Sequence, residues 1–282
     1  MDKDKDKNPG RVVVLGSASQ DLYVEMERHP TTGETVMAGD IVQRFGGKGG
    51  NQAVAAARAG AKTLFVGRLG DDDPGRTYRD RLVGHGVDVT RLVLEPDVPT
   101  GTALIMLNAE HDNMIVVAPG ANHRVDADQV AALHDLGPAD VLLMPMELPL
   151  DVTTAAITAA AGQGARVILN LAPYAPLPQE VLDACFLIIV NEKENKLMVG
   201  DGLTAPETLV TLGTDGSRWG DLKVPAQEVD AVDTTGAGDA YCGALAAALV
   251  AGADRRAAMV SATACSAATV SHMGAQPDPE LG

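Results

Sequence analysis

Short apolar runs alternate with longer Ala-rich stretches along most of the chain. The short runs are rich in β-branched residues and end at Gly or at a polar residue, which is typical of buried strands. They predict strands at residues 11–16, 63–67, 140–144, 166–170, 186–190 and 208–212. The longer stretches predict helices at residues 51–60, 74–84, 151–163, 239–251 and 254–270. This alternation predicts an α/β fold, a three-layer sandwich with a mostly parallel central sheet.

Two parts of the chain, at about residues 21–44 and 91–118, break this alternation because they contain short strands without helices between them. Residues 102–108 and 114–117, on either side of the polar segment 109–113, predict a hairpin. We expect a small β-sheet that projects from the large one, as a lid or as an edge for pairing with another subunit. Residues 1–10 predict a flexible tail, and residues 11–282 predict a single domain that carries this discontinuous lid.

Charge and composition exclude several classes of protein. Lys and Arg number 22 and Asp and Glu 38, so the formal net charge is −16. Such an acidic chain is not expected to bind nucleic acid or anionic lipid, which need clustered Lys and Arg. The first residues have no apolar core of a signal peptide, and no stretch approaches the roughly 20 apolar residues of a membrane span. Three widely spaced cysteines, Cys185, Cys242 and Cys265, predict buried small side chains, and we expect a cytoplasmic protein.

The first of two glycine-rich segments, residues 46–51 (GGKGGN), precedes a predicted helix. Its glycines allow the backbone to approach a ligand closely, and the amide of Asn51 can contact a pair of hydroxyl groups. The segment does not fit the GxxxxGK[ST] phosphate loop. A loop whose glycines serve only tight turns and packing explains the pattern equally well.

The second glycine-rich segment, residues 233–239 (DTTGAGD), opens the helix predicted at 239–251. Its backbone N–H groups lie at the positive end of the helix dipole, where they stabilise the negative charge of a transferring phosphoryl group. Asp239 beside them is a candidate general base for an attacking hydroxyl group. The alternative is that Asp239 only caps the helix, which is a common role of Asp.

Acidic and amide side chains at two other helix starts permit similar alternatives. Residues 191–194 (NEKE) follow an apolar strand and offer oxygen ligands for a hydrated Mg²⁺, but a helix N-terminus with favourable acidic residues explains them equally well. Asp71, Asp72 and Asp73 precede the helix at 74–84. We expect these three to cap that helix rather than to bind a metal.

The sequence resembles the ribokinase-like (PfkB) sugar kinases from residue 12 to residue 277. The motifs that carry the resemblance are residues 14–17 (VLGS), 30–35 (PTTGET), 46–53 (GGKGGNQA), 70–72 (GDD), 146–147 (ME), 191–194 (NEKE), 211–213 (TLG), 233–239 (DTTGAGD) and 274–277 (GAQP). The GGKG and DTxGAGD signatures, in this order, are specific to the family.

The resemblance implies a role for each matching residue. Asp239 would be the base, with Gly236, Ala237 and Gly238 as the anion hole. Together with Asp239, the sugar would contact Ser19, Asp21, Gly47, Lys48, Asn51 and Glu147. ATP and Mg²⁺ would contact Asn191, Glu194, Thr211, Gly213, Gly216 and Gly238. A monovalent cation, usually K⁺, would be held by Asp233, Thr235, Thr269, His272, Gly274 and Asp278.

The activity implied is ATP-dependent phosphorylation of the primary hydroxyl of a sugar, D-ribose to ribose 5-phosphate. Ser19 replaces an Asn that is usual in the family, so a kinase for another sugar or for a nucleoside is an alternative. The stretch before residue 208 has no room for a usual helix, and residues 219–225 are shortened, so we expect strand 208–212 to lack part of its cover. These losses leave a non-catalytic sugar-binding protein as a second alternative. The resemblance also implies a homodimer that forms through the lid sheet.

Overall fold

The computed structural model describes residues 10–110 and 112–277. Residues 1–9 of the expected tail and the expected cation ligand Asp278 lie outside the described residues. The described chain forms two sheets, eight α-helices and two short 3₁₀ segments, η1 (Gly120–Arg124) and η2 (Gly213–Asp215). No helix among residues 10–110 and 112–277 is both long and apolar enough to cross a membrane.

The large sheet has nine strands in the order β13-β12-β11-β10-β9-β8-β1-β4-β5. The strands are β1 (Val12–Leu15), β4 (Thr63–Gly70), β5 (Asp88–Glu95), β8 (Val141–Pro145), β9 (Arg166–Asn170), β10 (Leu187–Asn191), β11 (Thr208–Thr211), β12 (Ser217–Trp219) and β13 (Leu222–Val224). All neighbours from β11 to β5 pair in parallel, whereas β12 pairs antiparallel with both β11 and β13, so β12 alone runs against the other strands of this sheet. The expected parallel sheet is therefore confirmed.

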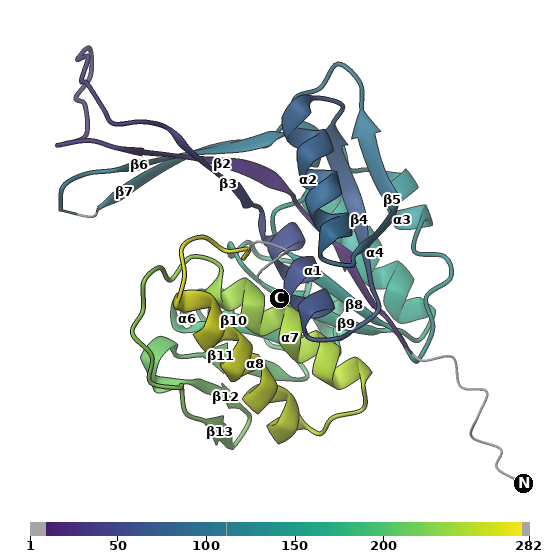
Figure 1. The fold of residues 1–282 in the computed structure, drawn as a ribbon. Helices are drawn as coiled ribbons and strands as arrows, with labels where there is room; N and C mark the ends of the chain where they lie inside the picture. Colours follow the sequence, from purple (N-terminus) through teal and green to yellow (C-terminus); the bar gives the residue numbers. More distant parts are fainter. Residues whose placement is uncertain (1–9, 111, 278–282) are drawn as a thin grey trace, which may run out of the picture.

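Helices cover both faces of the large sheet, so the predicted three-layer sandwich is also confirmed (Figure 1). One face packs against α1 (Lys48–Arg58), α2 (Asp73–Gly84), α7 (Ala237–Val250) and α8 (Arg255–Val270). The other packs against α3 (Ala127–Ala131), α4 (Leu150–Gly162), α5 (Gln179–Asp183) and α6 (Glu192–Gly200). Alternate residues of β1 enter the two cores: Val12 and Val14 belong to the core that contains α1, whereas Val13 and Leu15 belong to the core that contains α4. The strongly apolar strands follow from this two-sided burial.

The small sheet has four strands in the order β3-β2-β6-β7 and projects from the body of the molecule (Figure 1). Its strands are β2 (Ser19–Glu25), β3 (Val42–Gly46), β6 (Gly101–Leu107) and β7 (Asn113–Ala118). β6 and β7 form the expected hairpin. The expected start at about residue 91 is wrong, because residues 88–95 form β5, the edge strand of the large sheet. As an edge strand, β5 is only half-buried and lacks the strongly apolar run of a central strand, which explains the error.

Strand β11 is covered on both faces, so the expected loss of cover is wrong. Leu209 is buried among residues of α7 and α8, and Val210 is buried on the opposite face beside Met198 of α6. The short β12–β13 hairpin adds Trp219, which is 1% exposed and donates a hydrogen bond to Glu207 at 2.8 Å. A short hairpin and a large indole thus complete this end of the core.

The three cysteines are free thiols, as the sequence indicated. Cys185 and Cys242 are buried and Cys265 is half-buried. Burial raises the pKa of each thiol, so none of them is activated as a thiolate.

Candidate active site

Polar side chains follow the buried parts of several parallel strands, and they gather at the carboxyl edge of the large sheet. Ser17 follows β1, Glu147 follows β8, and Asn170 ends β9. Ser17 Oγ donates a hydrogen bond to Glu147 Oε2, and the same oxygen accepts the backbone N–H of Lys48 at 2.8 Å. Because ligands of open α/β sheets bind at this edge, the arrangement marks the region where a substrate would lie.

Two helices that start at this edge, α1 and α7, have glycine at the N-cap and no side-chain cap. Gly47 precedes α1 with φ of 80°, and Gly236 precedes α7 with φ of 76°. A Cβ on Gly47 would lie 2.8 Å from Ala18 Cα, and a Cβ on Gly236 would lie 2.4 Å from Ala275 Cβ. Both positions therefore require glycine. At α1 the N–H groups of Lys48 and Gly50 already donate to Glu147 and to the carbonyl of Ser17, whereas the first turn of α7 leaves backbone N–H groups for an anion.

Asp239 lies in the first turn of α7 with 5% of its surface exposed. The alternative role as the cap of α7 is wrong, since the N-cap is Gly236. Instead its carboxylate accepts hydrogen bonds from α1: Asn51 Nδ2 lies 2.9 Å from Oδ2, and Gln52 Nε2 lies 3.0 Å from Oδ1. Each carboxylate oxygen thus accepts one amide N–H, and its remaining lone pairs are available to accept a proton.

A lysine near Asp239 keeps its positive charge. The charge of Asp239 raises the pKa of Lys48, outweighing the opposite effect of partial burial, and Glu147 adds to the same effect. Lys48 directly follows the N-cap Gly47 and is the first residue of α1. The glycine-rich segment therefore places this lysine at the edge of the sheet. The protonated side chain offsets part of the unfavourable field of an acidic protein toward an anionic ligand.

A cavity of about 1170 Å³ lies between the small sheet and the carboxyl edge of the large sheet. Its lining contains expected sugar-binding residues, namely Ser19, Asp21, Gly47 and Glu147. It also contains expected cation ligands, namely Asp233, Thr235 and Gly274. Alternate residues of the small sheet, including Ala103, Ile105, Ile115 and Val117, form an apolar wall. The cavity combines a polar floor with an apolar cover, as small-molecule sites do.

Asp21 is the carboxylate of the cavity with the most perturbed protonation. Burial raises the pKa of Asp21 to about 6; a hydrogen bond from Ser19 Oγ at 2.9 Å opposes the shift, and the charges of Glu147 and Asp239 increase it. The Ser19 hydroxyl is therefore directed to Asp21, so Ser19 does not substitute for the longer Asn side chain that is usual at this position in the family. The pair presents one carboxylate with a fixed orientation to the cavity.

The loop before α7 is closed by Asp233. Its Oδ1 accepts the N–H of Thr235 at 2.9 Å, and its Oδ2 accepts the N–H of Gly274 at 2.8 Å. Burial opposes ionisation of Asp233, but these hydrogen bonds and the charge of Arg44 outweigh it and lower its pKa. Thr269 is buried in the last turn of α8, and His272 follows it. A carboxylate and main-chain carbonyl groups are hard oxygen donors, which fit a cation such as K⁺.

A second cavity, of about 760 Å³, lies beside the start of α6 and the end of β11. Three of the expected nucleotide-binding residues, Asn191, Thr211 and Gly213, line it. Asn191 and Glu194 form a capping box: Asn191 Oδ1 accepts the N–H of Glu194, and Glu194 Oε2 accepts the N–H of Asn191, both at 2.8 Å. The capping alternative is thus realised, and of this pair Asn191 lines the cavity, whereas Glu194 is half-buried one turn further along α6.

Within the described ranges, no three His, Cys, Asp or Glu side chains cluster in a way that could hold a metal ion. A Mg²⁺ ion that enters with a nucleotide does not need such a cluster, because it takes most of its ligands from phosphates and waters and only one or two carboxylates from a protein. Expected nucleotide-binding residues outside the lining of the second cavity are Glu194, Gly216 and Gly238. Gly216 lies in the turn between β11 and β12.

Three buried amides near Asp239 were not singled out from the sequence. Gln52 donates to Asn170 Oδ1 at 3.0 Å as well as to Asp239, and Gln276 Nε2 donates to Asn51 Oδ1 at 2.8 Å. Asn170 could have been found, because it is a polar residue at the end of a buried strand, like Asn191. Gln52 and Gln276 lie within the motifs 46–53 and 274–277, but no local pattern shows that their amides meet beside Asp239, since their partners come from distant parts of the chain.

The comparisons with known proteins agree with this geometry. Residues 10–281 match the pfkB family carbohydrate kinase pattern. The chain is 36% identical to a ribokinase of Bacillus subtilis over 94% of each chain, and 32% identical to a deoxyribokinase of Salmonella typhi over 94% of each chain. The solved structure of Arabidopsis thaliana ribokinase complexed with ribose and ATP superposes with a TM-score of 0.87 at 31% identity and covers 97% of each chain. The fold and the site thus define a phosphotransferase of the α/β class. The chain belongs to the pfkB family of carbohydrate kinases.

Proposed function

We propose that this protein transfers the γ-phosphoryl group of ATP to the primary hydroxyl of D-ribose and forms ribose 5-phosphate. The observation that carries the proposal is Asp239, a buried carboxylate in the first turn of the uncapped helix α7. The ribokinases and the ribose- and ATP-containing relative named above supply the substrate class. The two cavities provide separate spaces for a sugar and for a nucleotide.

In this proposal Asp239 accepts the proton of the attacking hydroxyl group. Asn51 and Gln52 hold its two oxygens, so the carboxylate has one orientation before the sugar binds. The N–H groups of Gly236, Ala237 and Gly238 are the anion hole for the transferring phosphoryl group, at the positive end of the α7 dipole. Catalysis then depends on positioning and electrostatics, as in other phosphoryl transfers.

Sugar hydroxyls would contact Ser19, Asp21, Gly47, Lys48, Asn51 and Glu147, whose polar groups lie on the floor of the larger cavity or beside Asp239. Ionised Asp21 accepts hydrogen bonds from hydroxyl groups and thereby orients the sugar. The apolar side chains of β6 and β7 cover the cavity and exclude water from the reacting hydroxyl.

Mg²⁺ and K⁺ belong to the proposal as ions that enter with the nucleotide and with the loop before α7. Mg²⁺ would be held by the ATP phosphates, waters and Glu194, and it neutralises phosphate charge during transfer. K⁺ would be held by Asp233 and by the carbonyls of Thr235, Thr269, His272 and Gly274, and its charge stabilises the loop that carries the anion hole. Asp278 is a further proposed ligand from outside the described residues.

The test is a coupled assay with ATP, Mg²⁺, K⁺ and a sugar panel. We expect turnover on D-ribose, and we expect Asp239→Asn to lower kcat by about 10³-fold, as loss of a general base does, while ribose still binds by calorimetry. The matched control is Asp254→Asn, which keeps a capping oxygen on Ala257 N–H at the start of the neighbouring helix α8. Activity of Asp239→Asn at the wild-type level would contradict the proposed base.

A kinase for a nucleoside or a larger sugar is the second candidate function. The supporting observation is the size of the larger cavity, about 1170 Å³, and its apolar wall, which give room for a base as well as a pentose. A panel of deoxyribose, ribose, adenosine and inosine separates the candidates by kcat/KM. Tight sugar binding without turnover on any of these acceptors would favour a non-catalytic sugar-binding protein.

The small sheet is also the proposed interface of a homodimer. In β7, Ile115 and Val117 line the larger cavity, so Met114 and Val116 lie on the opposite face, and they are 48% and 57% exposed. A second copy would cover this apolar face and the unpaired edge of β7. Light scattering should give a dimer mass, and Val116→Lys should give a monomer. A monomeric wild type at high protein concentration would contradict the proposal.

A further inference from the structure

The residues that hold Asp239 are themselves held by a second layer of amides. On one side, Asn51 donates to Asp239 through Nδ2 and accepts from Gln276 through Oδ1. On the other side, Gln52 donates both to Asp239 and to Asn170 Oδ1. All four amide residues are buried: Asn51, Gln52, Asn170 and Gln276.

The hydrogen positions on the Gln276 side follow from the groups at its two ends. The carbonyl oxygen of Gly46 can only accept, so Tyr78 donates its hydroxyl proton to it, at 2.6 Å. Tyr78 must then accept from Gln276 Nε2, at 2.7 Å, and the second hydrogen of that nitrogen goes to Asn51 Oδ1 at 2.8 Å. With its oxygen occupied in this way, Asn51 presents only its NH₂ group to Asp239.

Gln276 is in turn anchored by α2. Arg81 donates to the main-chain oxygens of Gln276 at 2.9 Å and of Pro277 at 2.6 Å, and its Nε lies 3.3 Å from Gln276 Oε1. Arg81 also stacks on Phe45, with its guanidinium carbon 4.6 Å from the ring centroid. The segment after α8 is therefore tied to α2, and its single amide reaches back to the start of α1.

On the other side, Gln52 also directs its NH₂ group toward Asp239, and this leaves its oxygen without a partner among the described residues. Asn170 donates to the carbonyl of Ile189 at 3.3 Å, so its oxygen faces Gln52. Both hydrogens of Gln52 are consequently used by Asp239 and Asn170, and Gln52 Oε1 is buried without a hydrogen-bond partner among the described residues. A buried amide oxygen without a partner is unfavourable for folding. This unfavourable arrangement is consistent with a role of the Gln52 NH₂ group as a donor to Asp239.

We propose that Gln276 is a positioning residue for the reaction: through Asn51 it ensures that Asp239 faces an amide donor, never an amide oxygen, so that the carboxylate is held in one orientation. This inference rests on the proposed role of Asp239 as the base. It adds a residue from the far end of the chain that lies outside the lining of both cavities.

The test compares two substitutions of similar size. In Gln276→Glu a carboxylate faces Asn51, which then turns its NH₂ group toward Glu and its oxygen toward Asp239. We expect kcat to fall about 100-fold and the acid limb of the kcat profile to move to higher pH, because the ionised base is now disfavoured. In Gln276→Met the donor is lost without a new charge, so kcat falls about tenfold and the acid limb stays in place.

The matched control is Gln129→Glu. Gln129 is a buried glutamine at the start of α3 whose oxygen accepts from Arg68 and from the N–H of Asp126, so a carboxylate there keeps both hydrogen bonds. We expect kcat and the pH profile of this variant to match the wild type. Thermal melting of all three variants identifies any that fail to fold. If Gln276→Glu fails to fold, Gln276→Met still tests the proposal.

The outcomes separate this inference from the proposed function. Wild-type kcat and an unmoved acid limb in a folded Gln276→Glu would overturn the positioning role, whatever Asp239→Asn does. If Asp239→Asn is itself active, the base assignment fails first. An inactive Asp239→Asn together with a shifted acid limb in Gln276→Glu supports both.

Discussion

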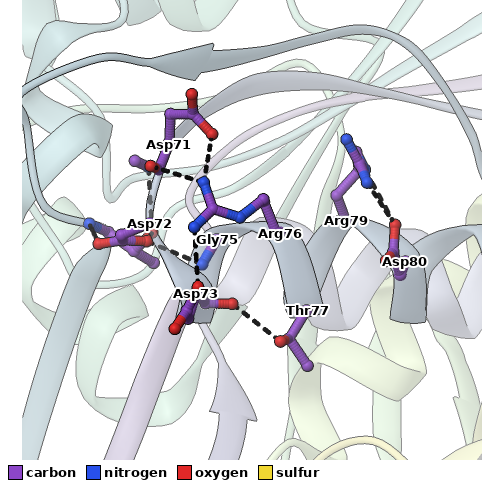
Figure 2. A network of polar contacts seen from close by, with 10 residues as sticks. Asp71, Asp72, Asp73, Gly75, Arg76, Thr77, Arg79 and Asp80 are labelled. Atoms are coloured by element: carbon purple, nitrogen blue, oxygen red, sulfur yellow. Dashed lines mark hydrogen bonds and ion pairs between the residues drawn. The ribbon is translucent and has the colours of Figure 1, made fainter.

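Two helix N-termini of the same layer, those of α7 and α2, differ in how their first turns are satisfied. At α2 the N-cap Asp72 accepts the N–H of Gly75 at 2.9 Å, and Asp71 and Asp73 form ion pairs with Arg76 (Figure 2). At α7 the N-cap is Gly236, and Asp239 turns away from the backbone toward α1. Both helices have an aspartate in the first turn, yet the side chains at the start of α2 bond to their own turn, whereas the start of α7 is open to a ligand.

The difference shows that an acidic residue at a helix start has no fixed meaning. Asp72 also accepts the N–H and the hydroxyl of Thr100, at 2.8 and 2.6 Å, so these three hydrogen bonds all serve the fold. Asp239 is held only by side-chain amides, which restrain it without neutralising it. A helix that gives up its cap loses stability, and at α7 this loss leaves N–H groups for an anion.

Among changes at the helix caps, a substitution at the N-cap of α7 should have the largest effect. Gly236→Ala places a side chain at φ of 76° and within 2.4 Å of Ala275 Cβ, so the loop must move. We expect kcat to fall about 100-fold, as loss of one oxyanion donor does, and stability to fall by about 1–2 kcal/mol. Steady-state kinetics and urea unfolding measure the two. An unchanged kcat would show that the α7 N-terminus is not the anion hole.

Opening α2 should affect stability alone. Asp72→Ala removes the cap and leaves Thr100 without its acceptor, which should cost about 2 kcal/mol. We expect kcat and both KM values to stay within a factor of about two, since α2 begins outside both cavities. A large loss of kcat in a folded Asp72→Ala would mean that the two helix starts are not functionally distinct.

The start of α6 lies between these extremes, because its capping box also borders the second cavity. Glu194→Gln keeps the box, since Gln at this position can make the same contact with the N-cap N–H, but removes the charge. We expect unfolding free energy to change by less than about 0.5 kcal/mol and the Mg²⁺ concentration for half-maximal activity to rise about tenfold. An unchanged Mg²⁺ requirement would assign Glu194 to capping only.

The smallest effect concerns pH and separates Asp21 of the cavity from Asp72 of the cap. The pKa of Asp21 is raised to about 6 by burial, so its ionised, hydroxyl-binding form is lost as pH falls through 6. Hydrogen bonds from Thr100 and Gly75 outweigh burial and lower the pKa of Asp72, so its stabilisation persists until pH falls below the ordinary Asp range. Between pH 7 and 5 we expect the KM for sugar to rise a few-fold with little loss from the cap. Asp21→Asn should abolish this dependence.

Much of the fold could be predicted because its signals are local. The apolar runs of β1, β9 and β10 lie within one residue of their predicted limits, and α8 begins where Asp254 caps it. β5 was misassigned because edge strands are only half-buried, so it lacks the strongly apolar run of a central strand. The cover of β11 was missed because Trp219 and α8 reach it from later in the chain.

The candidate site divides in the same way. The glycine-rich segments and Asp239 could be recognised from the sequence, since a backbone that bends at positive φ and an acid beside it leave a local mark. Residue types alone could not distinguish Asp72, which caps α2, from Asp239, which does not cap α7. That distinction depends on which donors reach each carboxylate, and for Asp239 these come from residues 51 and 52, far away in the chain.

By itself the sequence determined the alternation of strands and helices, the acidic charge and the positions where only glycine fits. The tertiary structure alone decided that Asn51, Gln52, Asn170 and Gln276 meet around one carboxylate and that the α7 N-terminus stays open. The physical reason is that periodicity and turn chemistry act between neighbours in the chain. Burial and the direction of a hydrogen bond, in contrast, depend on partners that only folding brings together.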